Sequence, residues 1–385
     1  MDRAKELLKK NTMIIALIIV TLYFALETNG TLLVPQNITN LIAQNGYVVV
    51  LAVGMLLCIL TGGNIDLSVG SVVALVGALA GTLMVNKDMN IWIAMPICLG
   101  AGILIGIIHG YWIAYLRIPA FIVTLAGMLL WRGVALMILG GLTVSPFPNQ
   151  YLNLFNTYLP DVFGGSINIL SLVIGFVACI IYIGAQVISR INKKRKGYEL
   201  ESIISLVGKM VIISLVVMTL SLSLAYHKGI PTILILLAVV VMIYAYFTTK
   251  TVPGRYLYAM GGNEKATKLS GINTNKVLFL AYVNMSFLSA VAALMCVARF
   301  NSAAPTAGMN YELDAIGACY IGGASAYGGT GTVGGVVIGA IFMGVLNNGM
   351  SIMGIDNNLQ KVIKGVVLLA AVTFDVLSKK RSKTS

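Results

Sequence analysis

Charged side chains are scarce in this sequence. Asp, Glu, Lys and Arg together make up 10% of its 385 residues, whereas hydrophobic residues make up 58%. Soluble domains carry about 25% charged residues, so this composition excludes an ordinary soluble protein. Because the apolar runs are continuous and do not alternate with polar residues, we expect helices rather than a β-barrel to cross a bilayer.

Residues that build catalytic and metal sites are also few. The two histidines, His109 and His227, have no carboxylate or cysteine nearby in the sequence, and the cysteines lie inside apolar runs without metal-ligand spacing. A membrane-bound enzyme is therefore disfavoured, and no metal site is expected. We interpret the cysteines as small apolar core residues. They are Cys58, Cys98, Cys179, Cys296 and Cys319.

A nucleotide-binding motif is missing as well. The run Gly328 to Gly335 is rich in glycine like a phosphate cradle, but no G-x-x-x-x-G-K-[ST] occurs anywhere in the sequence. If ATP drives this protein, another chain must hydrolyse it.

What the sequence does contain is a series of apolar segments near the roughly 20 residues that a membrane-spanning helix needs. They predict an all-α, polytopic integral membrane protein with about 10–12 transmembrane helices, forming a single domain over residues 1–385. The spans are expected at about 13–29, 46–61, 66–85, 91–115, 119–139, 168–189, 203–226, 230–249, 276–299, 311–327, 332–353 and 358–377.

The net charge of +13 indicates orientation rather than nucleic-acid binding, since no basic soluble domain with interleaved aromatics is present. Lys and Arg gather in alternate loops, which the positive-inside rule places in the cytoplasm together with both termini. The run 190–196 is expected to meet anionic lipid as well. The basic C-terminal tail lies in the cytoplasm only if the weakest span, 311–327, also crosses the membrane. A short re-entrant helix there is the alternative. The other basic regions are Arg117, the loop 250–276 and the tail 379–383.

A few polar side chains are expected inside the membrane, where an ionised group costs about 2.5–3.5 kcal/mol. Asp66 begins the third span and Arg132 lies deep in the fifth. Near or within the last three spans lie Asp314, Lys361 and Lys364. Two interpretations stay open for these residues: a polar lining of a solute path, or internal ion pairs that fix helix register. Asp66 could also cap a helix start.

The loop 250–276 is predicted to contain a short capped helix. Asn263 supplies the N-cap, Glu264 lies in the first turn, and Gly271 provides a left-handed exit. Docking on a cytoplasmic partner and resting on lipid headgroups are the two alternatives for this helix. Its small apolar face consists of Ala266 and Leu269.

Three separated motifs resemble those of one family. They look like the permeases of ATP-binding-cassette importers for monosaccharides, of the ribose, xylose and galactose type. The resemblance covers most of the chain except about 140–230, and the extra length there looks closer to the xylose and multiple-monosaccharide branch. Many relatives carry Gly where this sequence has Asn64. The motifs are Asn64-Ile65-Asp66-Leu67-Ser68-Val69-Gly70-Ser71, the loop Gly262-Asn263-Glu264 to Ser270-Gly271-Ile272, and Ile321-Gly322-Gly323-Ala324-Ser325 through Gly328-Gly329 and Gly331.

The resemblance implies a homodimer in the bacterial inner membrane that works by alternating access. It also implies a cytoplasmic double-cassette ATPase that holds ATP and Mg²⁺, an extracytoplasmic sugar-binding protein, and no cofactor in this chain. A coupling helix would dock on the ATPase through Gly262, Asn263, Glu264, Ala266, Leu269, Ser270 and Gly271. Candidates for the translocation pathway or gate are Asn64, Asp66, Ser68, Arg132, Asp314 and Ser325.

Two other functions remain as alternatives. An ion-coupled secondary transporter would need carboxylates in broken helices at mid-membrane, for which only Asp314 is a loose candidate. The second alternative is a cassette permease for another small polar solute, such as a nucleoside. The sequence does not identify the cargo, because selectivity in this class rests largely with the external binding protein.

Overall fold

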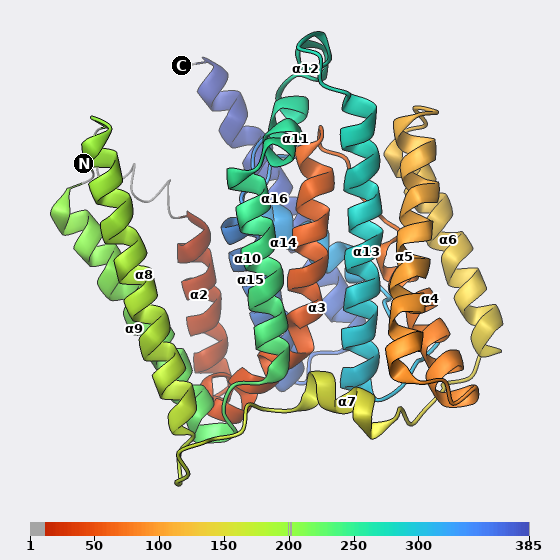
Figure 1. Cartoon of the computed structure of the whole chain (residues 1–385), viewed down its shortest axis with the longest axis horizontal. Helices are drawn as coiled ribbons and strands as arrows, with labels where there is room; N and C mark the ends of the chain where they lie inside the picture. The colour runs from red at the N-terminus through yellow and green to blue at the C-terminus, as the bar shows by residue number, and fades with distance from the viewer. Residues whose placement is uncertain (1–11, 199, 201, 385) are drawn as a thin grey trace. The chain divides into compact units, whose positions relative to one another are not determined.

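The computed structural model describes residues 12–198, 200 and 202–384, and over these residues the chain forms helices and no strand beyond isolated bridges. Figure 1 shows the long helices of the main unit running side by side. The predicted cytoplasmic N-terminus lies outside the described residues. By its internal contacts the described chain forms two compact units. The main unit comprises the described residues up to 32, residues 41–156 and those from 233 on, and the smaller unit comprises 33–40 and 157–232.

Nine helices in the described part are long and apolar enough to cross a membrane, which confirms the polytopic all-α prediction. They are α3 (Pro35–Leu60), α4 (Val69–Gly81) continued by η2 (Thr82–Asn86), α5 (Ile91–Ala114), α6 (Ala120–Leu139), α8 (Ile169–Arg195), α9 (Ile203–His227), α10 (Thr232–Lys250), α13 (Thr274–Phe300) and α15 (Val333–Ile352). The other elements are α2 (Thr12–Glu27), η1 (Thr31–Leu33), α7 (Asn149–Asn156), α11 (Val252–Gly262), α12 (Glu264–Leu269), α14 (Tyr311–Ile321) and α16 (Asn357–Thr384).

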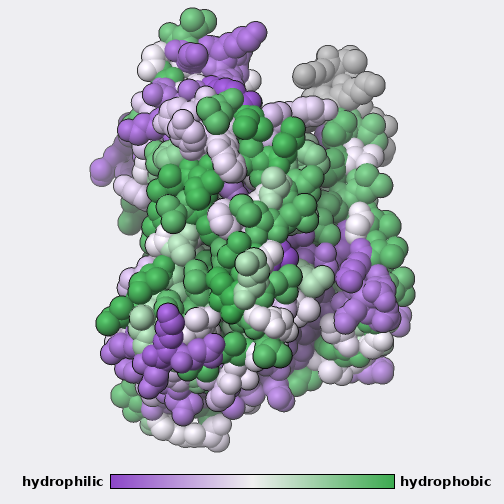
Figure 2. Space-filling model, turned by 90° about the vertical axis from the view of Figure 1, so that its right-hand side faces the viewer, coloured by the Kyte–Doolittle hydropathy of each residue, from purple (hydrophilic) through white to green (hydrophobic). Residues whose placement is uncertain are grey.

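The core of the main unit forms where small residues let helices approach closely. Along α5, Gly102 faces the carbonyl oxygen of Ser286 on α13, and Gly106 faces the backbone of Val283. Close contact through small residues stabilises helix pairs that have no hydrophobic driving force between them. The outer faces of α5 and α6 instead expose large apolar side chains, and Figure 2 shows an apolar band between polar zones on this side of the unit.

The region 311–327 differs from the prediction. Its helix, α14, has 11 residues, which at 1.5 Å per residue is about 16 Å, roughly half of a bilayer core. A continuous spanning helix over 311–327 is therefore wrong. The chain still passes from one end of the main unit to the other in this region. Ala303 pairs with Val144 beyond the end of α6, whereas Gly331 lies against α11, near the start of α13 and thus at the opposite end. A half-length helix and a non-helical stretch together make the passage.

Two further differences concern helix boundaries. Helix α3 begins at Pro35, where the expected span begins at 46, because Gln36, Asn37 and Asn40 are tolerated in a helix although they interrupt the apolar run. Helices α7 and α11 were not predicted. Both are short and lie between longer elements, so their apolar residues give no span-length signal.

The smaller unit is built around α8 and α9, which pack against each other with Gly175 against Ser221. Its loops are held by backbone bonds, among them Leu159 N–H to the carbonyl of Ile230 at 2.9 Å. The Asp161 carboxylate accepts the backbone N–H of Ile169 at 2.9 Å at the start of α8. This unit covers most of the 140–230 stretch, in which none of the three motifs lies.

Candidate functional site

At one end of the main unit, three segments that are far apart in the sequence lie against one another. They are the segment after α3, the α11–α12 junction and the loop 322–332. The N–H of Gly329 donates to the carbonyl of Leu60 at 3.1 Å. A Cβ at Gly261 would collide with that same carbonyl and with the nitrogen of Gly329, so only glycine permits this approach. The three motifs that carry the family resemblance thus converge at one site.

Tyr258 on α11 adds a side-chain link within this site. Its hydroxyl donates to the carbonyl of Gly331 at 2.9 Å. Burial raises the pKa of Tyr258, although a hydrogen bond with Thr248 acts in the opposite direction, so the hydroxyl keeps its proton and remains a donor. Helix α11 and the loop 322–332 are therefore connected by a side chain as well as by backbone contact.

Helix α12 has the local structure that the sequence predicts. The Asn263 side chain accepts the N–H of Ala266 at 3.0 Å, and Gly271 has a φ of +83°. The Ser270 hydroxyl donates to the carbonyl of Ala266 at 3.0 Å. Leu269 is 89% exposed and Ala266 is exposed as well, so the predicted apolar face of this helix points outward. Gly262, which precedes the helix, is exposed too.

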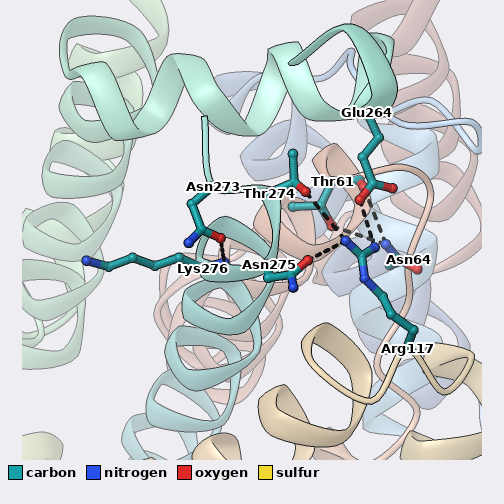
Figure 3. Close-up of polar contacts among 8 residues, drawn as sticks. All are labelled: Thr61, Asn64, Arg117, Glu264, Asn273, Thr274, Asn275 and Lys276. Carbon is teal, nitrogen blue, oxygen red and sulfur yellow. Dashed lines mark hydrogen bonds and ion pairs between the residues drawn. The ribbon is translucent and has the colours of Figure 1, made fainter. Parts of the chain in front are cut away.

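Arg117 ties α12 to the membrane helices. It lies in the turn between α5 and α6 with a φ of +57°, and its guanidinium donates to Glu264 at 2.7 Å. The same guanidinium also donates to Thr274 at 3.5 Å and to Asn275 at the start of α13 (Figure 3). In the sequence Arg117 indicates only orientation, and this role was not predicted because its partners lie about 150 residues away.

Asn64 serves a local turn. Its amide nitrogen donates to the hydroxyl and the carbonyl of Thr61 at 3.3 and 3.4 Å, as Figure 3 shows. Ser325 has a comparable role in the loop 322–332, where its hydroxyl accepts the N–H of Tyr327 at 3.1 Å and its backbone N–H donates to Thr330 at 2.9 Å. Both residues shape loops at the end of the unit where the three motifs meet.

Asp66 begins a buried chain of polar side chains. One of its oxygens accepts both the N–H and the hydroxyl of Ser68, at 2.8 and 2.6 Å. The Ser68 hydroxyl lies 3.4 Å from Nδ1 of His109 on α5, and Nε2 of His109 accepts from the indole of Trp131 on α6 at 2.9 Å. The chain thereby joins the non-helical segment before α4 to two further helices.

This buried chain corrects one expectation and adds two residues to the site. Asp66 binds Ser68, the residue at the N-cap of α4, instead of the amides of the first turn, so it does not cap that helix directly. His109 and Trp131 were not predicted, and the one signal for them in the sequence is a lone histidine inside an apolar span. The second carboxylate oxygen of Asp66 has no hydrogen-bond partner among the described residues. An oxygen without a partner in a buried site is costly, and it leaves an acceptor for a bound hydroxyl or water.

Arg132 holds the non-helical stretch before α14. Its guanidinium donates to the carbonyl of Pro305 at 3.3 Å and to that of Ala307. The same stretch contacts the start of α4, because a Cβ at Gly70 would collide with the carbonyl of Gly308 and approach the Glu312 carboxylate. The segments that lead into the half-length helix α14 and into α4 are thus held together inside the unit.

Asp314 forms an internal ion pair. Its carboxylate lies 3.0 Å from the ammonium of Lys364 on α16 and accepts the hydroxyl of Tyr47 on α3 at 2.9 Å. The Asp314 side chain is 2% exposed and that of Lys364 is 16% exposed. Of the two interpretations left open by the sequence, the geometry favours an ion pair that fixes the register of α14 against α16 and α3.

The candidate residues therefore form separate groups. Residues 262–271, Asn64 and Ser325 lie at one end of the main unit, Asp66 and Ser68 belong to the buried chain, and Arg132 and Asp314 have other partners. Among the described residues, no cluster of three His, Cys, Asp or Glu side chains could hold a metal ion.

The fold and this site define a multi-pass membrane protein whose exposed α12 is braced on its spanning helices. The family described as "Branched-chain amino acid transport system / permease component" matches residues 37–372, and the chain belongs to that family. The xylose transport system permease protein of Escherichia coli is 36% identical over 370 residues, covering 96% of this chain and 92% of that protein. That of Haemophilus influenzae is 36% identical over 369 residues, covering 96% of both chains. The ribose import permease protein of Escherichia coli is 34% identical over 369 residues, covering 96% of this chain and 94% of that protein. No solved structure matches.

Proposed function

We propose that this chain is the membrane-spanning permease subunit of an ATP-driven importer that carries a monosaccharide across the bacterial inner membrane by alternating access. The observation that carries the proposal is the similarity to xylose and ribose permeases along 96% of the chain. The chain is not an enzyme. ATP hydrolysis belongs to a separate subunit, in keeping with the lack of a nucleotide-binding motif in this sequence.

The partners in this proposal are a cytoplasmic double-cassette ATPase with its ATP and Mg²⁺, an extracytoplasmic sugar-binding protein and a second copy of the chain. Both termini lie in the cytoplasm. Charge supports this orientation, because Arg117, the basic loop 250–276 and the tail 379–383 then lie on the inner side. In that orientation α12 faces the cytoplasm, where the ATPase could contact it.

Helix α12 is the coupling helix in this mechanism. Its outward residues, including Leu269, are free to contact the ATPase, while Glu264 is bound to Arg117 on its inner side. A displacement of α12 therefore pulls on the α5–α6 turn and on the start of α13. The glycine contacts of the α11–α12 junction with Leu60 and Gly329 carry the same displacement to the segments before α4 and α15.

The gate in this proposal lies where those segments lead. Asp66 and Ser68 follow α3 directly, and Ser68 is linked through His109 to α5 and α6. When α5 and α6 move relative to α3, this chain of hydrogen bonds must break or rearrange. The Asp66 carboxylate oxygen that has no hydrogen-bond partner among the described residues would then be available to sugar hydroxyls.

Uptake in liposomes tests the proposal. The chain is reconstituted with a double-cassette ATPase and a sugar-binding protein from the same organism, and accumulation of radiolabelled xylose, ribose, galactose and a nucleoside is measured. We expect uptake that needs internal ATP and both partners and that survives an ionophore. Uptake that persists without ATP and collapses with an ionophore would establish an ion-coupled transporter. Transport of a nucleoside but no sugar would make the chain a cassette permease for another solute.

A further inference from the structure

An apolar crevice of about 640 Å³ runs between α10 and α13 in the main unit. This volume lies in the range of ligand-binding pockets, which is about 300–1,000 Å³. Ile243 of α10, Ile103 of α5 and Leu280 of α13 line the crevice, and each of these side chains is also exposed at the surface of the unit. The crevice is therefore open along the side of the helices, within the apolar band of a membrane protein.

The mouth of this α10–α13 crevice is polar and cationic. Lys276 and Asn273 at the start of α13 and Tyr256 on α11 belong to the lining at this end, and Lys276 is the one charged side chain in the described lining. Figure 3 shows that Lys276 extends away from Arg117, so it takes no part in the Arg117 network. Two further cations lie on the helices that form the mouth, since α10 ends at Lys250 and α11 carries Arg255.

The depth of the crevice matches one leaflet of a bilayer. Along α13 the lining runs from Lys276 to Phe287, and the eleven residue-to-residue steps between them, at 1.5 Å each, give about 16 Å. Half of a bilayer core is about 15 Å. A cation at headgroup level above an apolar slot of this depth is complementary to a phospholipid with an anionic headgroup.

We propose that the α10–α13 crevice binds one anionic phospholipid, with its phosphate at Lys276 and an acyl chain along α13. The lipid contacts Pro253 and Leu257 of α11 as well as Ile272 and Asn273, so it touches the segments on both sides of α12. It therefore braces the loop proposed to couple to the ATPase. Lipid binding itself requires neither a particular cargo nor the ATPase, so its failure would leave the uptake experiment unaffected.

Photolabelling in nanodiscs tests the lipid site. The full-length chain is placed in phosphatidylcholine doped with phosphatidylglycerol that carries a photoreactive group on its acyl chain, and labelled peptides are mapped. We expect labels between residues 276 and 287 that excess phosphatidylglycerol displaces. Removing one cation near the headgroups costs about 1 kcal/mol, so the Lys276→Gln variant should need about fivefold more phosphatidylglycerol for the same labelling.

Three controls keep this test decisive. Lys276→Arg retains the cation and should label like the wild type, which separates charge from folding. Lys196→Gln removes an exposed cation that does not line the crevice and should have no effect. Equal displacement by phosphatidylethanolamine, which carries no net charge, would overturn the proposal, as would absence of label from residues 276–287. Disulfide-linked dimers of an Ile243→Cys variant would also overturn it, because a second copy of the chain would then occupy the crevice.

Discussion

Arg132 donates to two backbone carbonyls, those of Pro305 and Ala307, and so determines the course of the non-helical stretch before α14. Arg132→Ala leaves both acceptors without this donor. Because these acceptors are partly buried, losing their donor should cost up to about 1–3 kcal/mol, and we expect a lower unfolding temperature and reduced uptake. Thermal unfolding followed by fluorescence size-exclusion chromatography, together with liposome uptake, checks this. Wild-type values in both measurements would show that Arg132 is dispensable.

Variants of Asp314 and Lys364 test whether their ion pair fixes the register of the helices or belongs to the solute path. Asp314→Asn leaves the Lys364 ammonium without its carboxylate, and removing one partner of a buried pair costs about 3–5 kcal/mol. We therefore expect a strongly destabilised single variant. The double variant Asp314→Asn/Lys364→Met should regain most of the stability and transport normally if the pair only fixes register. A stable double variant without uptake would contradict that interpretation and place Asp314 in the solute path.

At the scale of elements, helix α12 has one exposed face and one face bound to the rest of the main unit. Leu269 is 89% exposed, so Leu269→Asp should leave folding unchanged and abolish both stimulation of the ATPase and uptake. The matched control is Leu142→Asp, since Leu142 is 72% exposed in the loop after α6. Liposome ATPase assays measure the effect. Normal stimulation by the Leu269→Asp variant would remove the coupling assignment.

The link between α12 and the spanning helices rests on Arg117. Its pair with Glu264 is about 40% exposed on both sides, and such pairs contribute about 0–1 kcal/mol, so Arg117→Ala should barely change stability. We expect instead that ATP hydrolysis continues while the sugar transported per ATP falls. Arg117→Lys keeps the charge but cannot bind Glu264, Thr274 and Asn275 together, and should be intermediate. An unchanged ratio of sugar to ATP would contradict this role.

At the scale of the whole molecule, the orientation in the membrane can be tested with single added cysteines, without removing the native ones. The five native cysteines are buried, so a membrane-impermeant thiol reagent should give little background. We expect Leu269→Cys to react only in inside-out vesicles and Leu142→Cys only in right-side-out vesicles. Mass spectrometry of the labelled chain measures both. The opposite pattern would invert the positive-inside assignment.

The sequence by itself determined the features that depend on local patterns. Apolar runs of span length predicted most of the long helices, and Asn263 and Gly271 predicted the capped form of α12, because capping and hydrophobic burial act within a few residues. Three separated motifs, in their order along the chain, predicted the family.

The tertiary structure decided which distant residues meet. It placed His109 beside Ser68, Arg117 beside Glu264 and Asp314 beside Lys364, and it made α14 half the length of a span. No periodicity encodes these contacts, since each depends on how helices far apart in the chain pack. A lone charge in an apolar run shows that a partner is needed, and only packing determines which residue that partner is.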